Sequence, residues 1–136
     1  MQNKLTTLTA FLVVKNGKEA AEFYQAGFGA EILDRFEGPD GRLTARISVD
    51  GAEFWMGDEE PEYNNLSPET VGGTAARFVL TVEDPDALFT KALNAGAKQI
   101  CPMTTEESWR IGKLYDPSGH IWEIGKPLDS SATSQT

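Results

Sequence analysis

An internal repeat constrains the fold of this sequence more than any single motif does. In the first half, an apolar segment ending at Val14 leads through a short turn into residues 18–29, whose apolar side chains recur at helical spacing. In the second half, the apolar segment 78–82 leads in the same way into residues 86–96. The two copies are offset by about 68 residues, and a repeat of this kind predicts two copies of one supersecondary unit.

Both predicted helices carry start and stop signals. Each begins after a residue that can cap the helix N-terminus, and each ends at a glycine that can leave the helix with a positive φ angle. The signals are Asn16, Glu19 and Gly29 in the first copy, and Asp84, Pro85 and Gly96 in the second. The side chains expected to point inward are Ala20, Phe23, Tyr24 and Phe28 in the first helix, and Leu88, Ala92 and Leu93 in the second.

Three strands are expected after each helix, the last two joined by a tight turn. Asp50-Gly51 is a strong hairpin signal in the first copy, and residues 116–119 (DPSG) serve the second. Each copy is therefore a βαβββ module, and the fold class is α+β. We expect one domain over residues 1–127, with module one at about 5–57, a polar linker at 58–73 and module two at about 74–127, followed by a flexible tail at 128–136.

The alternation of side chains along the strands divides each sheet into two faces. The face toward the helix is expected to hold Leu8, Leu12 and Val14 in module one, and Phe78, Leu80 and Val82 in module two. The opposite, concave face is expected to hold Thr9, Phe11, Arg46, Trp55, Arg77 and Glu123. A concave surface with charges and a tryptophan is a candidate ligand cavity.

Five segments in this order and spacing carry a resemblance to a known family: FLVVKNGKEAAEFYQAGFGAEI, FEGPDGRLTARISVDGAEFWMGDE, SPETVGGT, FVLTVEDPDALFTKALNAGA and YDPSGHIWEIGKP. Across residues 5–127 the sequence resembles the glyoxalase/bleomycin-resistance/dioxygenase (vicinal oxygen chelate) superfamily, in particular its small bacterial glyoxalase-like members. The resemblance implies two βαβββ modules forming an open barrel around a cavity, commonly in a homodimer. Functions within the family include glyoxalase isomerisation, ring-cleaving dioxygenation, fosfomycin modification and drug sequestration, so fold does not settle function.

The resemblance also implies where a metal would be held. In metal-dependent members, the first and last strands of each module supply one ligand each, usually His or Glu. These positions fall on Thr9 and Trp55 in module one and on Arg77 and Glu123 in module two. Only Glu123 has a suitable donor, and the protonated Arg77 repels a cation. We therefore expect neither a metal nor another cofactor.

Several residues have more than one interpretation. Glu123 and Arg77 form either a structural ion pair or a site that contacts a ligand, with Glu123 as a candidate catalytic group. Trp55, Phe11 and Trp109 are either cavity walls that stack on a planar ligand or plain core. Trp122 alternates in step with the side chains that face the helix, so we expect it to lie in the core.

His120, the only histidine, is expected to order the 116–119 turn or to pack near the helix rather than to act in catalysis. Cys101, the only cysteine, is expected to be buried and inert.

Charge and hydropathy exclude some partners. Twelve Lys and Arg against 21 Asp and Glu give a net charge of −9, with no basic cluster, so nucleic acid is not an expected partner. No apolar stretch is long enough to cross a bilayer, and the N-terminus lacks the pattern of a signal peptide. A single cysteine excludes an internal disulfide, which fits a reducing cytoplasm.

Two hypotheses for function follow. The first is a cytoplasmic, homodimeric protein that binds a small molecule in a barrel cavity without metal. The second is an enzyme, namely a divergent glyoxalase-like lyase, isomerase or dioxygenase that uses Glu123 as a metal ligand or as a base.

Overall fold

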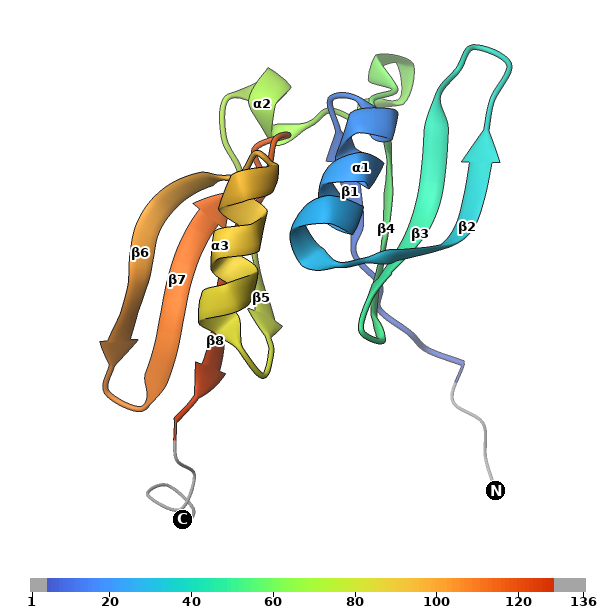
Figure 1. Ribbon diagram of the computed structural model, residues 1–136. Coiled ribbons are helices and arrows are strands. Elements are labelled where there is room, and N and C mark those ends of the chain that lie inside the picture. The colour runs from blue at the N-terminus through green and yellow to red at the C-terminus, as the bar shows by residue number, and fades with distance from the viewer. Residues whose placement is uncertain (1–4, 129–136) are drawn as a thin grey trace.

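The computed structural model describes residues 5–128, which form two βαβββ modules joined by a linker with two short helices (Figure 1). Module one consists of β1 (Phe11–Val14), α1 (Gly17–Phe28), β2 (Glu31–Glu37), β3 (Leu43–Val49) and β4 (Ala52–Asp58). The linker contains η1 (Pro61–Tyr63) and α2 (Pro68–Val71). Module two consists of β5 (Arg77–Thr81), α3 (Pro85–Ala95), β6 (Lys98–Glu106), β7 (Trp109–Tyr115) and β8 (Ile121–Pro127).

The two modules have the same sheet topology. Strand order is β1-β4-β3-β2 in the first sheet and β5-β8-β7-β6 in the second. The first and last strands of each module are parallel neighbours, and the connection between them includes the helix. The other neighbouring strands are antiparallel. Phe11 pairs with Trp55, and Val79 pairs with Glu123, so both partners shift by 68 positions between the modules. This register confirms the repeat, and the two unclosed sheets fit an open barrel.

The helix boundaries follow the predicted signals. The side chain of Asn16 accepts a hydrogen bond from the Glu19 N–H at the start of α1, and Gly29 ends that helix with φ of 68°. Asp84 caps α3 in the same manner through the Ala87 N–H, and Gly96 ends it. Local chemistry thus determines both ends of each helix.

One hydrophobic core spans both modules, because α1 and α3 pack against each other in the middle of the molecule (Figure 1). The helices approach closely: a Cβ built on Gly27 would lie only 3.3 Å from the Cα of Ala92. Each helix covers one face of its own sheet. The opposite face of each sheet is therefore not covered by these helices.

A buried carboxylate connects the modules beneath the turn between β7 and β8. Asp116 Oδ2 accepts hydrogen bonds from the Tyr24 hydroxyl of α1 at 2.6 Å and from Trp122 Nε1 at 3.0 Å. Its Oδ1 accepts from the backbone N–H groups of Ser118 and His120. The His120 ring also lies against module one, with Nε2 2.7 Å from the Val13 carbonyl oxygen. The predicted roles of His120 in the turn and of Trp122 in the core agree with this geometry.

Three sequence-based expectations need correction or fall outside the structure. Leu8 is fully exposed, because regular pairing begins only at Phe11. On α3 Ala92 is buried as predicted and Phe89 is buried although the sequence pattern missed it, whereas Leu88 and Leu93 are only half-buried. The expected tail lies outside the described residues from 129 onward.

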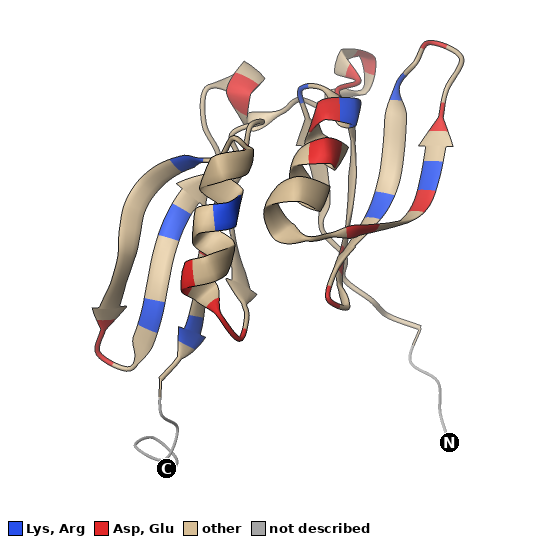
Figure 2. Cartoon of the chain, in the orientation of Figure 1, with Lys and Arg blue, Asp and Glu red and all other residues tan. Residues whose placement is uncertain are grey.

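The charges of the described residues are interspersed rather than gathered. Figure 2 shows acidic and basic positions alternating over both modules, with basic residues on β6, β7 and β8 as well as on the first sheet. None of the helices in residues 5–128 is long and apolar enough to span a membrane.

Candidate functional site

The uncovered face of the first sheet is centred on Trp55 of β4. Phe11 of β1 and Arg46 of β3 are its neighbours on either side. The Trp55 ring stacks on Phe36 of β2, with ring centroids 6.3 Å apart and an interplanar angle of 17°. The Phe11 ring lies over Gly57, where an added Cβ would come within 2.9 Å of it. Of the three aromatic residues proposed from the sequence as cavity walls, Trp55 and Phe11 lie on this face, where Phe36 joins them, and Trp109 does not.

Arg46 is held on this face by two carboxylates. Its Nε lies 2.6 Å from Asp34 Oδ2, and its Nη1 lies 2.7 Å from Glu53 Oε1. These hydrogen bonds raise the pKa of the Arg46 guanidinium, Asp34 having the largest effect. The group carries one more negative than positive charge, so the first face is slightly acidic.

The uncovered face of the second sheet is centred on Glu123, the equivalent of Trp55 in the repeat. Val79 of β5 and Lys113 of β7 are its neighbours. Glu123 Oε2 lies 3.1 Å from Arg77 Nε and 3.5 Å from Lys113 Nζ. The Glu123 side chain is 14% exposed, whereas that of Arg77 is 62% exposed. Arg77, Lys113 and Glu123 together carry one net positive charge. The group of Arg46, Asp34 and Glu53 on the first face carries the opposite net charge.

Two pockets lie beside Glu123. The larger, of about 450 Å³, is lined by Val79, Glu106, Glu107, Ser108, Trp109, Ile111 and Glu123. The smaller, of about 200 Å³, is lined by Cys101, Thr104, Glu106, Ile111, Gly112, Lys113 and Glu123. Both ion pairs of Glu123 are formed through its Oε2 atom, at 3.1 Å from Arg77 and 3.5 Å from Lys113. The larger pocket thus combines an aromatic ring, apolar side chains and three glutamate residues.

The structure brings together only some of the predicted site residues. Arg77 contacts Glu123 as expected, and Trp109 shares a pocket with it. Phe11, Trp55 and Arg46 gather instead on the first sheet, and Thr9 is exposed in the segment before β1.

Sequence reasoning missed Lys113 at this site. The signal was the alternation of side chains along this strand: Leu114 is buried, so its neighbour Lys113 points to the opposite face of the sheet, where it lies beside Glu123.

Cys101 was expected to be buried but is exposed. It lies on β6, an edge strand of the second sheet, where the pairing with β7 slips on both sides of Cys101. Residues 98–102 are all exposed, since an edge strand lacks one neighbour and the bulged segment lies beyond the cover of α3.

The residues at the inherited metal positions do not fit a divalent cation. Glu123 is the one carboxylate among them, and Arg77 and Lys113 already place two positive charges against it. A cation at this place would have to displace both. Within residues 5–128, no group of three His, Cys, Asp or Glu side chains is arranged to hold a metal ion.

Comparison with known proteins identifies related sequences. The model of the Glyoxalase/Bleomycin resistance protein/Dioxygenase superfamily matches residues 5–124. An uncharacterized protein of Mycobacterium bovis is 37% identical over 127 residues, covering 89% of this chain and 83% of that protein. An uncharacterized protein of Mycobacterium tuberculosis has the same identity over the same length and is covered to 74%.

Solved structures with low sequence identity share the fold. TioX from Micromonospora sp. ML1 has a TM-score of 0.71 at 21% identity, covering 90% of this chain and 99% of that one. The fosfomycin resistance protein FosX from Listeria monocytogenes, complexed with Mn(II) and sulfate, has a TM-score of 0.70 at 13% identity, covering 96% and 99%. A glyoxalase-related enzyme from Fulvimarina pelagi has a TM-score of 0.65 at 21% identity, covering 90% and 88%.

Proposed function

The chain belongs to the Glyoxalase/Bleomycin resistance protein/Dioxygenase superfamily, and on this basis we propose that it binds a small organic molecule beside Glu123 without a resident metal. The observation that carries the proposal is the carboxylate of Glu123, held by Arg77 and Lys113 at the wall of a pocket of about 450 Å³. Pockets of this size are typical of small-molecule sites. Trp109 offers a planar surface, and the carboxylate of Glu123 can accept a hydrogen bond from the ligand.

The proposed assembly is a homodimer in which a second copy covers the ligand. Phe11, Phe36 and Val79 are each more than half exposed on the uncovered sheet faces. The group around Arg46 carries one net negative charge and the group of Arg77, Lys113 and Glu123 one net positive charge, so these two groups complement each other when face one of one copy meets face two of its partner. A reducing cytoplasm, suited to a protein with a single cysteine, is the compartment where we expect it to act.

A thermal-shift screen with a small-molecule library tests the binding function. A ligand at about 100 times its dissociation constant should stabilise the protein by about 2.7 kcal/mol. Trp109→Ala should abolish that stabilisation, whereas Glu22→Gln, an exposed change on α1 far from the pocket, should leave it intact. Ligands that stabilise the wild type and Trp109→Ala equally would reject this pocket as their site.

Elemental analysis tests the metal-free part of the proposal. The purified protein should contain far less than one zinc, nickel, iron or manganese per chain, because the charges around Glu123 oppose a cation. About one equivalent of metal that disappears in Glu123→Gln would overturn it.

A second candidate is an enzyme that uses Glu123 as a general base. It is favoured by the position of the Glu123 carboxylate, which lines the larger pocket and can accept a proton from a ligand bound there. If this is correct, the protein should exchange carbon-bound deuterium out of ligands found in the screen, and Glu123→Gln should stop the exchange while still binding them. Exchange at equal rates in both proteins would reject the role of base.

A further inference from the structure

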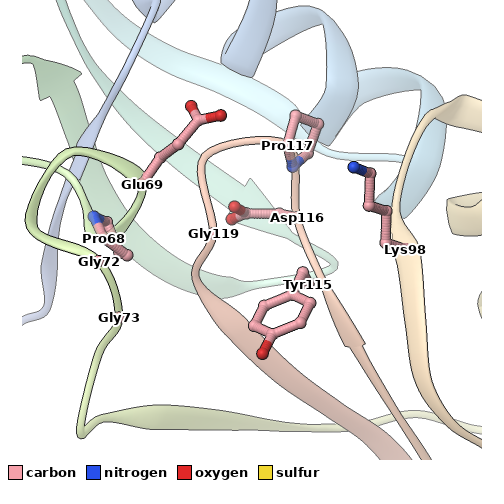
Figure 3. Close-up of a pocket in the computed structure, with 9 residues that line it drawn as sticks. All are labelled: Pro68, Glu69, Gly72, Gly73, Lys98, Tyr115, Asp116, Pro117 and Gly119. Carbon is pink, nitrogen blue, oxygen red and sulfur yellow. The ribbon is translucent and has the colours of Figure 1, made fainter.

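A separate pocket lies between the linker helix α2 and one end of the β6–β7 pair (Figure 3). It has a volume of about 350 Å³ and shares no lining residue with the pockets beside Glu123. Three segments of the chain build it, and its lining residues are Pro68, Glu69, Gly72, Gly73, Lys98, Tyr115, Asp116, Pro117 and Gly119.

The walls of this pocket are fixed before any ligand binds. The buried Asp116 carboxylate accepts four hydrogen bonds and holds the turn that forms the floor. The Glu69 N–H donates to the Ser118 carbonyl oxygen at 3.2 Å, which joins α2 to that turn. A Cβ added to Gly119 would lie 3.2 Å from Pro68 Cβ, so the two walls are already in close contact. A ligand here would meet a preorganised site, which lowers the cost of binding.

Two opposite charges face this pocket from different sides. Figure 3 shows Glu69 on the α2 side and Lys98 on the β6 side, with the turn through Asp116 and Pro117 between them. Neither side chain forms an ion pair with another residue of the range 5–128. Lys98 and Tyr115 are partners across β6 and β7, so both line the pocket from this strand pair.

The remaining surface of the pocket is apolar or open. Pro68 and Pro117 contribute ring carbons, and Tyr115 contributes an aromatic ring. Gly72 and Gly73 have positive φ angles of 93° and 153°, and a Cβ on either would meet nothing within 4 Å. The pocket is therefore open where these glycines border it and can admit a small ligand.

We propose that this pocket binds a zwitterionic metabolite, namely a free α-amino acid or a close analogue. The ligand carboxylate pairs with Lys98, the ligand ammonium pairs with Glu69, and an apolar side chain packs on Tyr115 and the prolines. Charge-assisted hydrogen bonds at both ends favour a zwitterion over a ligand with one charge, which would leave one wall without a partner. A volume near the small end of ligand pockets fits a molecule of this size.

The test is titration of the full chain with L-leucine, L-phenylalanine and L-proline, followed by NMR of the backbone amides. At least one amino acid should give saturable shifts at Gly72, Gly73 and Gly119. Its N-acetyl and carboxamide derivatives should each bind at least about tenfold more weakly, a loss of about 1.4 kcal/mol. Absence of saturable shifts at these glycines with all three amino acids, up to about 10 mM, would overturn the proposal, because that limit corresponds to a binding free energy weaker than about 2.7 kcal/mol.

Substitutions of the two charged residues provide the second arm. Lys98→Met and Glu69→Gln should each weaken binding about tenfold, and the controls Lys91→Met and Glu22→Gln should not change it. Unchanged binding in both pocket variants would overturn the assignment. Trp109→Ala should leave amino-acid binding intact, so this result is independent of the ligand site proposed beside Glu123.

Discussion

Glu123 and Arg77 differ in exposure, and this difference sets the strength of their contact. The carboxylate is 14% exposed, but the guanidinium is 62% exposed. Solvent therefore screens one partner of the pair, and Lys113 offers the carboxylate a second cation. An exposed ion pair of this kind contributes less than about 1 kcal/mol, in contrast to the 3–5 kcal/mol lost when a buried pair is broken.

We expect Arg77→Met to lower the free energy of unfolding by less than about 1 kcal/mol, because Lys113 remains beside Glu123. Glu123→Gln should cost more than Arg77→Met, since it leaves two cations without their carboxylate. The double mutant should recover part of the combined loss. Urea unfolding of the four proteins measures the coupling, and strict additivity would contradict the contact. A loss of several kcal/mol in Arg77→Met would mean that the pair is buried.

Tyr24 is the residue of α1 that donates to the buried Asp116 of module two. Burial, and then the nearby Asp116 carboxylate, raise the pKa of the Tyr24 phenol well above 10.0, so the hydroxyl keeps its proton as a donor. Tyr24→Phe leaves Asp116 Oδ2 with Trp122 alone and should cost about 1–3 kcal/mol in unfolding free energy.

Chemical denaturation of Tyr24→Phe measures this cost. Tyr63→Phe is the matched control, because Tyr63 is 72% exposed on η1. Equal stability of the two variants would show that the bond between the modules contributes nothing.

At the scale of elements, the Glu59 carboxylate is one of the anchors of helix α2. Glu59 accepts hydrogen bonds from the Ser67 N–H at 2.9 Å and from the Thr70 hydroxyl. Bonds from Ser67 and then Thr70 lower the pKa of Glu59 from 4.5 to about 2. A four-residue helix with so few contacts of its own needs such an anchor, since isolated short helices are unstable in water.

The lowered pKa of Glu59 predicts a specific pH dependence. The ionised carboxylate stabilises the folded state above its unfolded pKa of about 4.5, and this contribution is lost as pH falls toward about 2. The difference in unfolding free energy between the wild type and Glu59→Gln should be constant near neutral pH and should shrink over that interval. Denaturant titrations at several pH values measure it. A difference that does not change between pH 4.5 and 2 would show that Glu59 has an ordinary pKa.

At the scale of the whole molecule, the placement of α1 and α3 determines which surfaces are exposed. The helices pack on each other, and each sheet turns its other face away from them. Phe36 and Val79 remain 58% and 54% exposed on those faces. Exposed apolar patches on sheet faces are typical of interfaces, which is why we expect a second copy to cover them.

Charge substitutions on the two faces test this dimer. The wild type should have the mass of a dimer in light scattering at tens of micromolar. Phe36→Glu and Val79→Glu should each shift it toward the monomer, because a carboxylate would be buried in the interface. Tyr63→Glu, at an exposed aromatic residue on the linker, should remain dimeric. A monomeric wild type would contradict the assembly directly.

The sequence by itself determined the modules of this protein, because their signals are local. Helix capping, helix termination by glycine and the alternation of side chains each act over a few residues, as at Asn16 and Gly29 in module one and at Asp84 and Gly96 in module two. The 68-residue repeat reproduces these signals in both modules. The contact between Arg77 and Glu123 was predicted from the family resemblance, which assigns both residues to one set of ligand positions. The resemblance also added the arrangement of the two modules as an open barrel.

Only the tertiary structure decided how the modules meet and what that leaves exposed. Contacts between segments far apart in the chain set the close approach of Gly27 to Ala92 and the hydrogen bond from Tyr24 to Asp116. The bulge of an edge strand accounts for the exposure of Cys101. Periodicity fixes the face on which a side chain lies but not what covers that face. Lys113 joined the Glu123 site because of the register between β7 and β8, which the alternation along a single strand does not determine.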